Sequence, residues 1–315
     1  WKISRNESTF KTNYFIRVSN GKLEGIGEVA PNIRYNETPE LIKAQFSQFI
    51  NSGITESASP EEFSHNLSTL ELCNSLRFGI ESAFIHFHCA HADTPVYKFL
   101  GLNAPKNIAT TYTLPIMEPE KIRDFIETYN LKRFKSLKIK VNKTTGLDMI
   151  KEVSRISNHP LMIDANEAWT DVDELLMFME QIKNNNILFI EQPLPSSHKE
   201  EYKYLKSKSP FLLIADESIT NEVNMEEISN QFHGVNMKLM KAGGYLNGLR
   251  ILKEAQSHSL KTMIGCMVET TLGIASALHL AAGIDFIDLD GFFLIKDEPF
   301  RLVKEENGVL NLNEK

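Results

Sequence analysis

Three acidic residues each close one of three consecutive apolar runs. Asp164 ends PLMID, Glu191 ends ILFIE and Asp216 ends FLLIAD. A single acid at such a place is most often a helix cap, but three at the ends of neighbouring strands, about 4.8 Å apart, would repel one another without a cation. Three oxygen ligands with no His or Cys nearby favour Mg²⁺ over Zn²⁺. We therefore expect these residues to bind one Mg²⁺ per subunit.

Lysines flank these acids in the sequence. In LKIKVN, Lys138 and Lys140 are two residues apart, so on a strand they share one face. In NMKLMKAGG, Lys238 lies on the strand after the third acid and Lys241 follows it. A buried lysine is costly to desolvate unless it has a partner or a task. One lysine on each side of a substrate would take a proton from one face of a carbon and return one to the other.

These side chains need a fold that gathers strand ends. The 315 residues are 42% hydrophobic and 24% charged, which is typical of a globular enzyme of one or two domains. Eight short apolar runs alternate with helical stretches, and eight βα units predict a closed (β/α)8-type barrel over 106–291 whose active site lies at the carboxyl ends of the strands. The predicted strands are 108–114, 136–141, 160–164, 187–191, 211–216, 234–239, 261–267 and 285–290.

Residues 1–105 follow another pattern. Two strand-like stretches around the turn-prone SNGK predict a β-hairpin over 13–30. Three helical patterns follow, over 39–50, 60–72 and 75–92. We expect an α+β capping domain to which residues 292–315 return. The predicted fold class is α/β, a barrel with an α+β cap.

Composition limits the possible partners and the cellular compartment of the protein. The formal charge of −7 offers no basic surface for nucleic acid, and no apolar run reaches the roughly 18 residues that span a bilayer. The three cysteines, Cys73, Cys89 and Cys266, form no C-x-x-C pair, which is typical of reduced thiols in the cytoplasm. We expect a cytoplasmic protein with a small-molecule substrate and without nucleic acid or membrane partners, and a homo-oligomer stays open. Because the chain opens at Trp1 without a Met, we also expect its natural start to be missing.

Seven motifs, taken in order, resemble one known family. This set covers nearly the whole chain and is similar to the muconate-lactonizing subgroup of the enolase superfamily. The resemblance implies that the three acids hold Mg²⁺, that the metal binds a substrate carboxylate, and that a lysine removes the α-proton to give an enediolate. The motifs are GIGEVAP (25–31), KIK (138–140), IDANEAW (163–169), IEQPLP (190–195), ADES (215–218), NMKLMKAGG (236–244) and GCMVET (265–270).

The same resemblance assigns further residues. It makes Lys140 and Lys238 the acid/base pair. The residues that it places at the substrate are Thr113, Lys138, Cys266 and Met267.

The last strand indicates the substrate. It ends IDLDG, where Asp288 and Asp290 share one face and resemble the D-x-D of dipeptide epimerases, which binds the ammonium group of the substrate. Two more carboxylates in an acidic mouth need such a cationic group. We expect a Mg²⁺-dependent epimerase that inverts the α-carbon of the C-terminal residue of a dipeptide by two-lysine 1,1-proton transfer.

Side-chain preference and two rival functions stay open. In this family a capping-domain loop, here 3–10, reads the epimerised side chain, with 33–37 closing nearby. Arg5 and Arg34 are candidates for binding a glutamate carboxylate, so L-Ala-D/L-Glu is one expected substrate. An N-acylamino acid racemase or o-succinylbenzoate synthase would use the same lysines without the two aspartates. A ligand-binding protein on a degenerate barrel would need no lysine pair.

Overall fold

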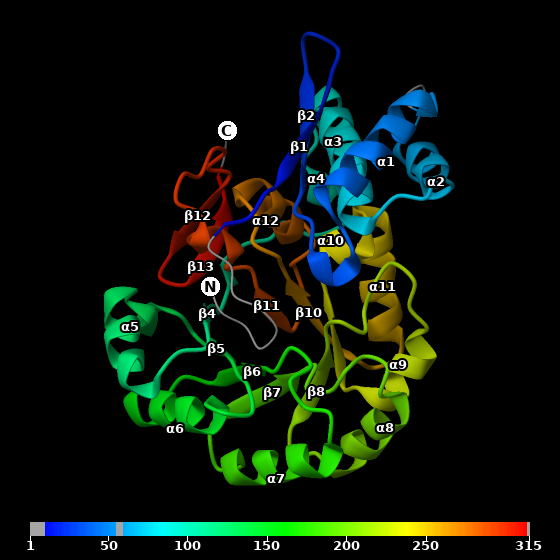
Figure 1. The fold of residues 1–315 in the computed structure, drawn as a ribbon. Helices are drawn as coiled ribbons and strands as arrows, with labels where there is room; N and C mark the ends of the chain where they lie inside the picture. The colour runs from blue at the N-terminus through cyan, green and yellow to red at the C-terminus, as the bar shows by residue number, and fades with distance from the viewer. Residues whose placement is uncertain (1–9, 55–58, 314–315) are drawn as a thin grey trace.

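The computed structural model describes residues 10–54 and 59–313. Its centre is a sheet of eight parallel strands in chain order, with helices outside it (Figure 1). Each of the eight predicted runs contains one strand of this sheet. The α/β barrel with an extra capping unit is confirmed. The strands are β4 (Tyr112–Leu114), β5 (Leu137–Lys140), β6 (Leu161–Asp164), β7 (Ile187–Glu191), β8 (Leu212–Ala215), β9 (Gly234–Met237), β10 (Lys261–Gly265) and β11 (Phe286–Asp288).

Hydrogen bonds join the first strand of the barrel to the last. The backbone N–H of Thr111 donates to the carbonyl of Ile287 at 3.3 Å. Two residues further on, the N–H of Thr113 donates to Asp290 Oδ2 at 2.6 Å. The contact between β4 and β11, which we call the seam of the barrel, therefore ends at the barrel mouth with the side-chain carboxylate of Asp290.

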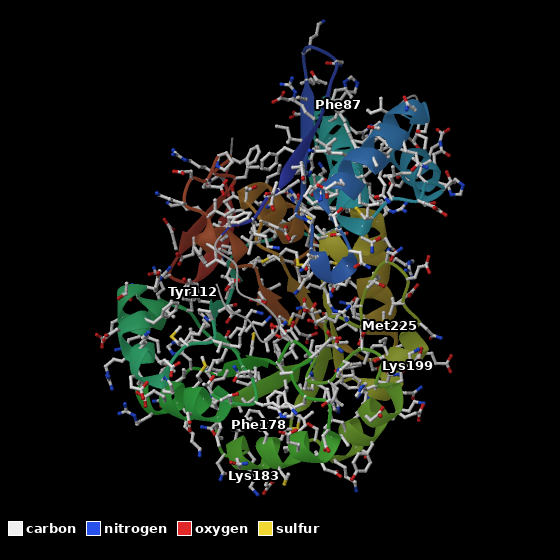
Figure 2. The ribbon with its side chains drawn as sticks, viewed as in Figure 1. Phe87, Tyr112, Phe178, Lys183, Lys199 and Met225 are labelled. Carbon is white, nitrogen blue, oxygen red and sulfur yellow. The ribbon has the colours of Figure 1, made fainter. Side chains whose placement is uncertain are left out.

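The outer helix α7 (Val172–Ile182) is amphipathic, and its apolar face packs against the sheet. In α7, Phe178 is 8% exposed and lies against the barrel, whereas Lys183, just past the helix end, lies at the outer surface (Figure 2). Among the described residues, no helix combines the length and apolarity needed to cross a bilayer. The helices are η3 (Pro119–Lys121), α5 (Ile122–Thr128), η4 (Leu131–Arg133), α6 (Gly146–Ile156), α7 (Val172–Ile182), α8 (Lys199–Lys208), α9 (Met225–Gln231), α10 (Leu239–Ala242), α11 (Tyr245–Ser257), α12 (Thr271–Leu278) and η5 (Gly291–Leu294).

The predicted strand 108–114 is divided between two sheets. Its beginning forms β3 (Ile108–Ala109), which pairs with the C-terminal strand β13 (Val309–Leu312), itself antiparallel to β12 (Val303–Glu306). The described C-terminal residues therefore lie beside the start of the barrel. They also reach the cap hairpin, where the rings of Phe15 and Phe300 are 5.0 Å apart.

The cap lies beyond the upper side of the barrel in the view of Figure 1. The hairpin and the three helices predicted for it are present, but the second helix ends at Ser68 instead of 72. Beyond Ser68, the guanidinium of Arg77 binds the carbonyls of Leu67, Leu70 and Leu72, which holds the chain in a turn. The cap elements are β1 (Tyr14–Ser19), β2 (Glu24–Val29), η1 (Ile33–Tyr35), α1 (Pro39–Asn51), α2 (Pro60–Ser68), α3 (Asn74–His91) and α4 (Val96–Phe99).

Two buried glutamates of the cap bind the N-termini of barrel helices. Glu28 of β2 accepts from Thr270 N at 2.9 Å and from Gly273 N at 2.9 Å, at the start of α12. Glu81 of α3 accepts from the backbone N–H of Tyr245, at the start of α11. A carboxylate at a helix N-terminus is stabilised by the unpaired N–H groups and the helix dipole. The cap is thereby fixed to the two helices that follow β9 and β10.

An apolar layer fills the lower barrel and sets the level of the site. Met162, Phe189, Ile214 and Met263 point inward from β6, β7, β8 and β10 and are at most 4% exposed. Because side chains alternate along a strand, the residues two positions later also point inward, above this layer. On β6, β7 and β8 those residues are the three predicted metal ligands.

Candidate active site

The acid triad, Asp164, Glu191 and Asp216, lies at one end of the barrel. Asp164 pairs in register with Glu191 across β6 and β7. The three residues are 1%, 0% and 4% exposed, so their charges have almost no contact with water. The structure thus brings the three predicted acids together at the ends of neighbouring strands.

Each carboxylate of the acid triad is held through one oxygen. The donors come from the loop after β6, from β9 and from α10. They are a backbone N–H, a side-chain amide and an ammonium group: Asn166 N to Asp164 Oδ1 at 3.1 Å, Asn236 Nδ2 to Glu191 Oε1 at 2.8 Å, and Lys241 Nζ to Asp216 Oδ1 at 2.5 Å.

The other oxygen of each carboxylate points to a lysine. These ammonium groups hold the pKa values of Asp164 and Asp216 well below their usual range, although burial alone would raise them. The distances are Lys138 Nζ to Asp164 Oδ2, 3.1 Å, and to Glu191 Oε2, 2.8 Å; Lys140 Nζ to Asp164 Oδ2, 2.8 Å; and Lys238 Nζ to Asp216 Oδ2, 2.9 Å.

The cation beside Glu191 does not fully compensate the negative charge around it. Burial, together with Asp164 and Asp216, raises the pKa of Glu191 to about 7 despite Lys138. Its Oε2 accepts no hydrogen bond of good geometry, even though Lys138 Nζ is close. Within the described ranges no three His, Cys, Asp or Glu side chains already meet as a metal cluster, because ammonium groups lie between the carboxylates. Three carboxylates, each held through one oxygen and each with its other oxygen beside an ammonium group, supply the oxygen ligands that a divalent cation prefers.

Lys140 and Lys238 lie on opposite sides of the acid triad. Lys140 ends β5, next to Asp164, and also donates to Asn166 Oδ1 at 3.0 Å. Lys238 follows β9, on the far side of β8, and burial opposes its charge. The attraction of Asp216 outweighs this, so the pKa of Lys238 lies well above its ordinary value. The side chains of the two lysines are 13% and 11% exposed, so both reach the mouth.

Asp288 and Asp290 meet Thr113 at the seam of the barrel. Asp288 Oδ2 lies 2.7 Å from Lys138 Nζ, and its Oδ1 accepts from Thr113 Oγ1 at 3.5 Å. Asp290 accepts from the N–H of Thr113. Burial and the neighbouring Asp288 raise the pKa of Asp290 to about 6. The structure thus groups three residues that the sequence predicted at the substrate.

The segment after β10 supplies two more predicted residues. The thiol of Cys266 donates to the carbonyl of Asp288 at 3.4 Å and accepts from Gly291 N at 3.4 Å, so it joins β10 to β11. Met267 is partly buried, and its sulfur accepts from Asn32 Nδ2 at 3.6 Å. Met267 therefore lies where the cap meets the barrel mouth.

A short piece of the cap, the cap segment (residues 31–37), crosses this mouth; it is the blue stretch between β2 and α1 in Figure 1. Arg34 donates two hydrogen bonds to Glu167, which follows β6. Burial raises the pKa of Tyr35 well above its ordinary value, and the nearby charge of Asp216 adds to this. Arg34 is thus at the mouth, as predicted, but bound to the protein. Arg5 lies outside the described residues.

Comparison with known proteins places the chain in a family. Residues 121–309 match the family model described as enolase C-terminal domain-like. A hydrophobic dipeptide epimerase from a Flavobacteria bacterium is 32% identical over 98% of this chain and 90% of its own length. This chain belongs to the enolase superfamily. The L-Ala-D/L-Glu epimerase of Bacteroides thetaiotaomicron is 33% identical over 70% of this chain, and the chain spans 57% of that relative's length.

Solved structures agree with the superfamily assignment. An enolase family member from Agrobacterium tumefaciens, with homology to dipeptide epimerases and solved with sodium and L-Ala-L-Glu, superposes with a TM-score of 0.89 at 25% identity. The superposition covers 100% of this chain and 94% of that one. The resemblance stated from the motifs is confirmed, and so is the expectation of an enzyme of the isomerase class.

Several site residues of this enolase-superfamily chain escaped the sequence reasoning. Asn236 carried a signal, because it stands two residues before Lys238 and so shares its strand face. The position of Lys241 after the strand end does not predict its contact with Asp216. Glu167 lies in the motif 163–169 and Tyr35 in the segment 33–37, but the contacts of each at the mouth depend on a loop path that the sequence does not define.

Proposed function

We propose that this protein is an epimerase that inverts the α-carbon of the C-terminal residue of a dipeptide. The observation that carries the proposal is the placement of Lys140 and Lys238 on opposite sides of the acid triad, each within 3 Å of one of its members. Two bases that face one carbon from opposite sides are what a 1,1-proton transfer requires. The named activities of the two relatives support this reading.

The metal in this proposal is Mg²⁺, held by Asp164, Glu191 and Asp216. When bound, it neutralises the negative charge that the substrate carboxylate gains as the α-proton leaves. Lys138 adds a fixed positive charge beside Asp164 and Glu191. The ligand oxygens are kept in place by Asn166, Asn236 and Lys241, as orienting hydrogen bonds do around many metals.

The proton steps fall to the two lysines. One lysine, as the neutral amine, takes the α-proton from its side of the substrate. The other, as the ammonium, gives a proton to the opposite side, and the configuration is inverted. In the reverse direction the lysines exchange roles, so both epimers are substrates.

Asp288 and Asp290 set the kind of substrate. They would bind the free ammonium group of the dipeptide, which an acylated amino acid lacks. Burial and, after it, the charge of Asp288 raise the pKa of Asp290, and a bound cation would offset both effects. This favours a dipeptide over the substrates of an N-acylamino acid racemase or o-succinylbenzoate synthase. A binding protein on the same barrel would not need two lysines in this arrangement.

A dipeptide library tests the proposal. Enzyme with Mg²⁺ would be incubated with the library in D₂O, and products would be analysed by mass spectrometry and chiral separation. We expect one deuterium in the C-terminal residue of the turned-over dipeptides, together with the other epimer. A library without exchange or inversion in any member would contradict the proposal.

A further inference from the structure

We propose that the epimerised residue preferred by this enzyme carries a neutral side chain, because the guanidinium group of Arg34 at the barrel mouth is already paired with Glu167. The inference rests on the proposed function and names the substrate class of the same site. It starts from the cap segment, which connects the loops after β6 and β10 above the acid triad.

The Arg34–Glu167 pair is bidentate. Arg34 Nε lies 3.2 Å from Glu167 Oε2, and its terminal nitrogen lies 3.0 Å from Oε1. Two parallel bonds of this kind are among the strong hydrogen bonds of proteins. The Glu167 side chain is only 8% exposed and also accepts from Ser196 N at 2.9 Å. The carboxylate is therefore held from both sides and cannot turn away into water.

A glutamate side chain of a substrate would have to displace Glu167 from Arg34. The buried Glu167 would then lose its cation, and an uncompensated buried charge is strongly unfavourable. A neutral side chain leaves the pair intact. The flanking residues fit this reading, since Arg34 stands between Ile33, which is 73% exposed, and the aromatic Tyr35.

Four lysines near the acid triad are also engaged. Each contacts a carboxylate of the acid triad at 2.5 to 3.1 Å. Using one of them for a substrate side chain would remove charge compensation from the predicted metal site. These cations are Lys138, Lys140, Lys238 and Lys241.

Three dipeptides of similar size test the preference: L-Ala-L-Gln, L-Ala-L-Met and L-Ala-L-Glu. We expect kcat/KM for the first two to exceed that for L-Ala-L-Glu by about tenfold or more. A value for L-Ala-L-Glu equal to or above the other two would overturn this inference alone and would point to a cation outside the described residues, such as Arg5. Turnover of none of the three would overturn the proposed function and this inference with it.

Variants of the pair provide an independent test. Glu167→Gln frees the Arg34 charge, so the ratio of kcat/KM for L-Ala-L-Glu over L-Ala-L-Gln should rise about tenfold. The matched control is Glu152→Gln on α6, which breaks a bidentate pair with Arg155 at the outer surface and should leave the ratio unchanged. An unchanged ratio in folded Glu167→Gln would contradict the inference.

A double variant covers the case in which Glu167→Gln does not fold. Arg34→Gln with Glu167→Gln removes both charges together, so the ratio should stay within about twofold of the parent value. If Arg34 instead bound the substrate carboxylate in the parent enzyme, the double variant would lose L-Ala-L-Glu turnover selectively. That loss would overturn the inference.

Discussion

The amide of Asn236 holds Glu191. Its Nδ2 donates to Oε1 at 2.8 Å, and the other oxygen, Oε2, lies 2.8 Å from Lys138 Nζ. The contact joins β9 to β7 across the interior, and both residues are fully buried. Glu191 is thereby oriented without any change in the charge of the site.

Removing this hydrogen-bond donor should weaken the binding of Mg²⁺. We expect Asn236→Ala to lower Mg²⁺ affinity about 10- to 100-fold, the usual cost of losing an orienting bond behind a metal ligand. The rise in Tm with Mg²⁺ concentration measures this affinity without an activity assay. Asn230→Ala, at an exposed position of α9, is the control. Equal affinity in both variants would contradict the orienting role.

The acid triad itself should be indispensable for turnover. Asp216→Asn and Glu191→Gln each remove one ligand charge, so we expect epimerase activity to fall at least about 1000-fold while the fold is retained. Activity should also vanish in EDTA and return with Mg²⁺. Elemental analysis would check that the metal has been removed. Full turnover after that removal would rule out a catalytic role for the metal.

The ammonium-binding role of Asp290 predicts a substrate preference. Free dipeptides should be turned over about 10- to 100-fold better than their N-acetyl forms, because acetylation removes the cation that would compensate the buried carboxylate of Asp290. Asp290→Asn should reduce kcat/KM mainly for the free dipeptide, since the amide oxygen still accepts from Thr113. Equal values for both forms in the parent would move the assignment toward an N-acylamino acid racemase.

Glu81 predicts a pH dependence of stability that is separate from the site. Burial raises its pKa from 4.5 to about 7, although Ser64 and the start of α11 favour the charged form. Between these two values the folded state binds more protons than the unfolded state, so the contribution of Glu81 to stability falls as pH rises from about 4.5 to about 7. The total change is on the order of 3 kcal/mol.

Urea unfolding at several pH values checks this. In Glu81→Gln the free energy of unfolding should lose that downward trend, whereas the control Glu71→Gln, at an exposed site of the cap, should keep it. Parallel pH curves for the parent and Glu81→Gln would show that Glu81 does not titrate in this way.

The sequence predicted the parts of this site that depend on strand periodicity. Asp164, Glu191 and Asp216 end apolar runs, and the two-residue spacing of Lys138 and Lys140 defines a face. Both signals depend only on residues close together in the sequence, so they can be read without knowledge of the fold.

Contacts between distant loops could not be predicted in the same way. Arg34 and Glu167 are 133 residues apart in sequence, and Arg34 was predicted to bind a substrate instead of the protein. The division of run 108–114 between two sheets was also missed, because its β3 part depends on pairing with β13 at the other end of the chain. No local pattern encodes either partner.

Solvent exchange in single-lysine variants tests the central claim most directly. Lys140→Ala and Lys238→Ala would be incubated in D₂O with each epimer of a turned-over dipeptide, and ¹H NMR would follow the α-proton. We predict that neither variant epimerises and that each exchanges the α-proton of one epimer only, the two variants acting on opposite epimers. Interconversion of both epimers at the parent rate by either variant would contradict the two-base mechanism.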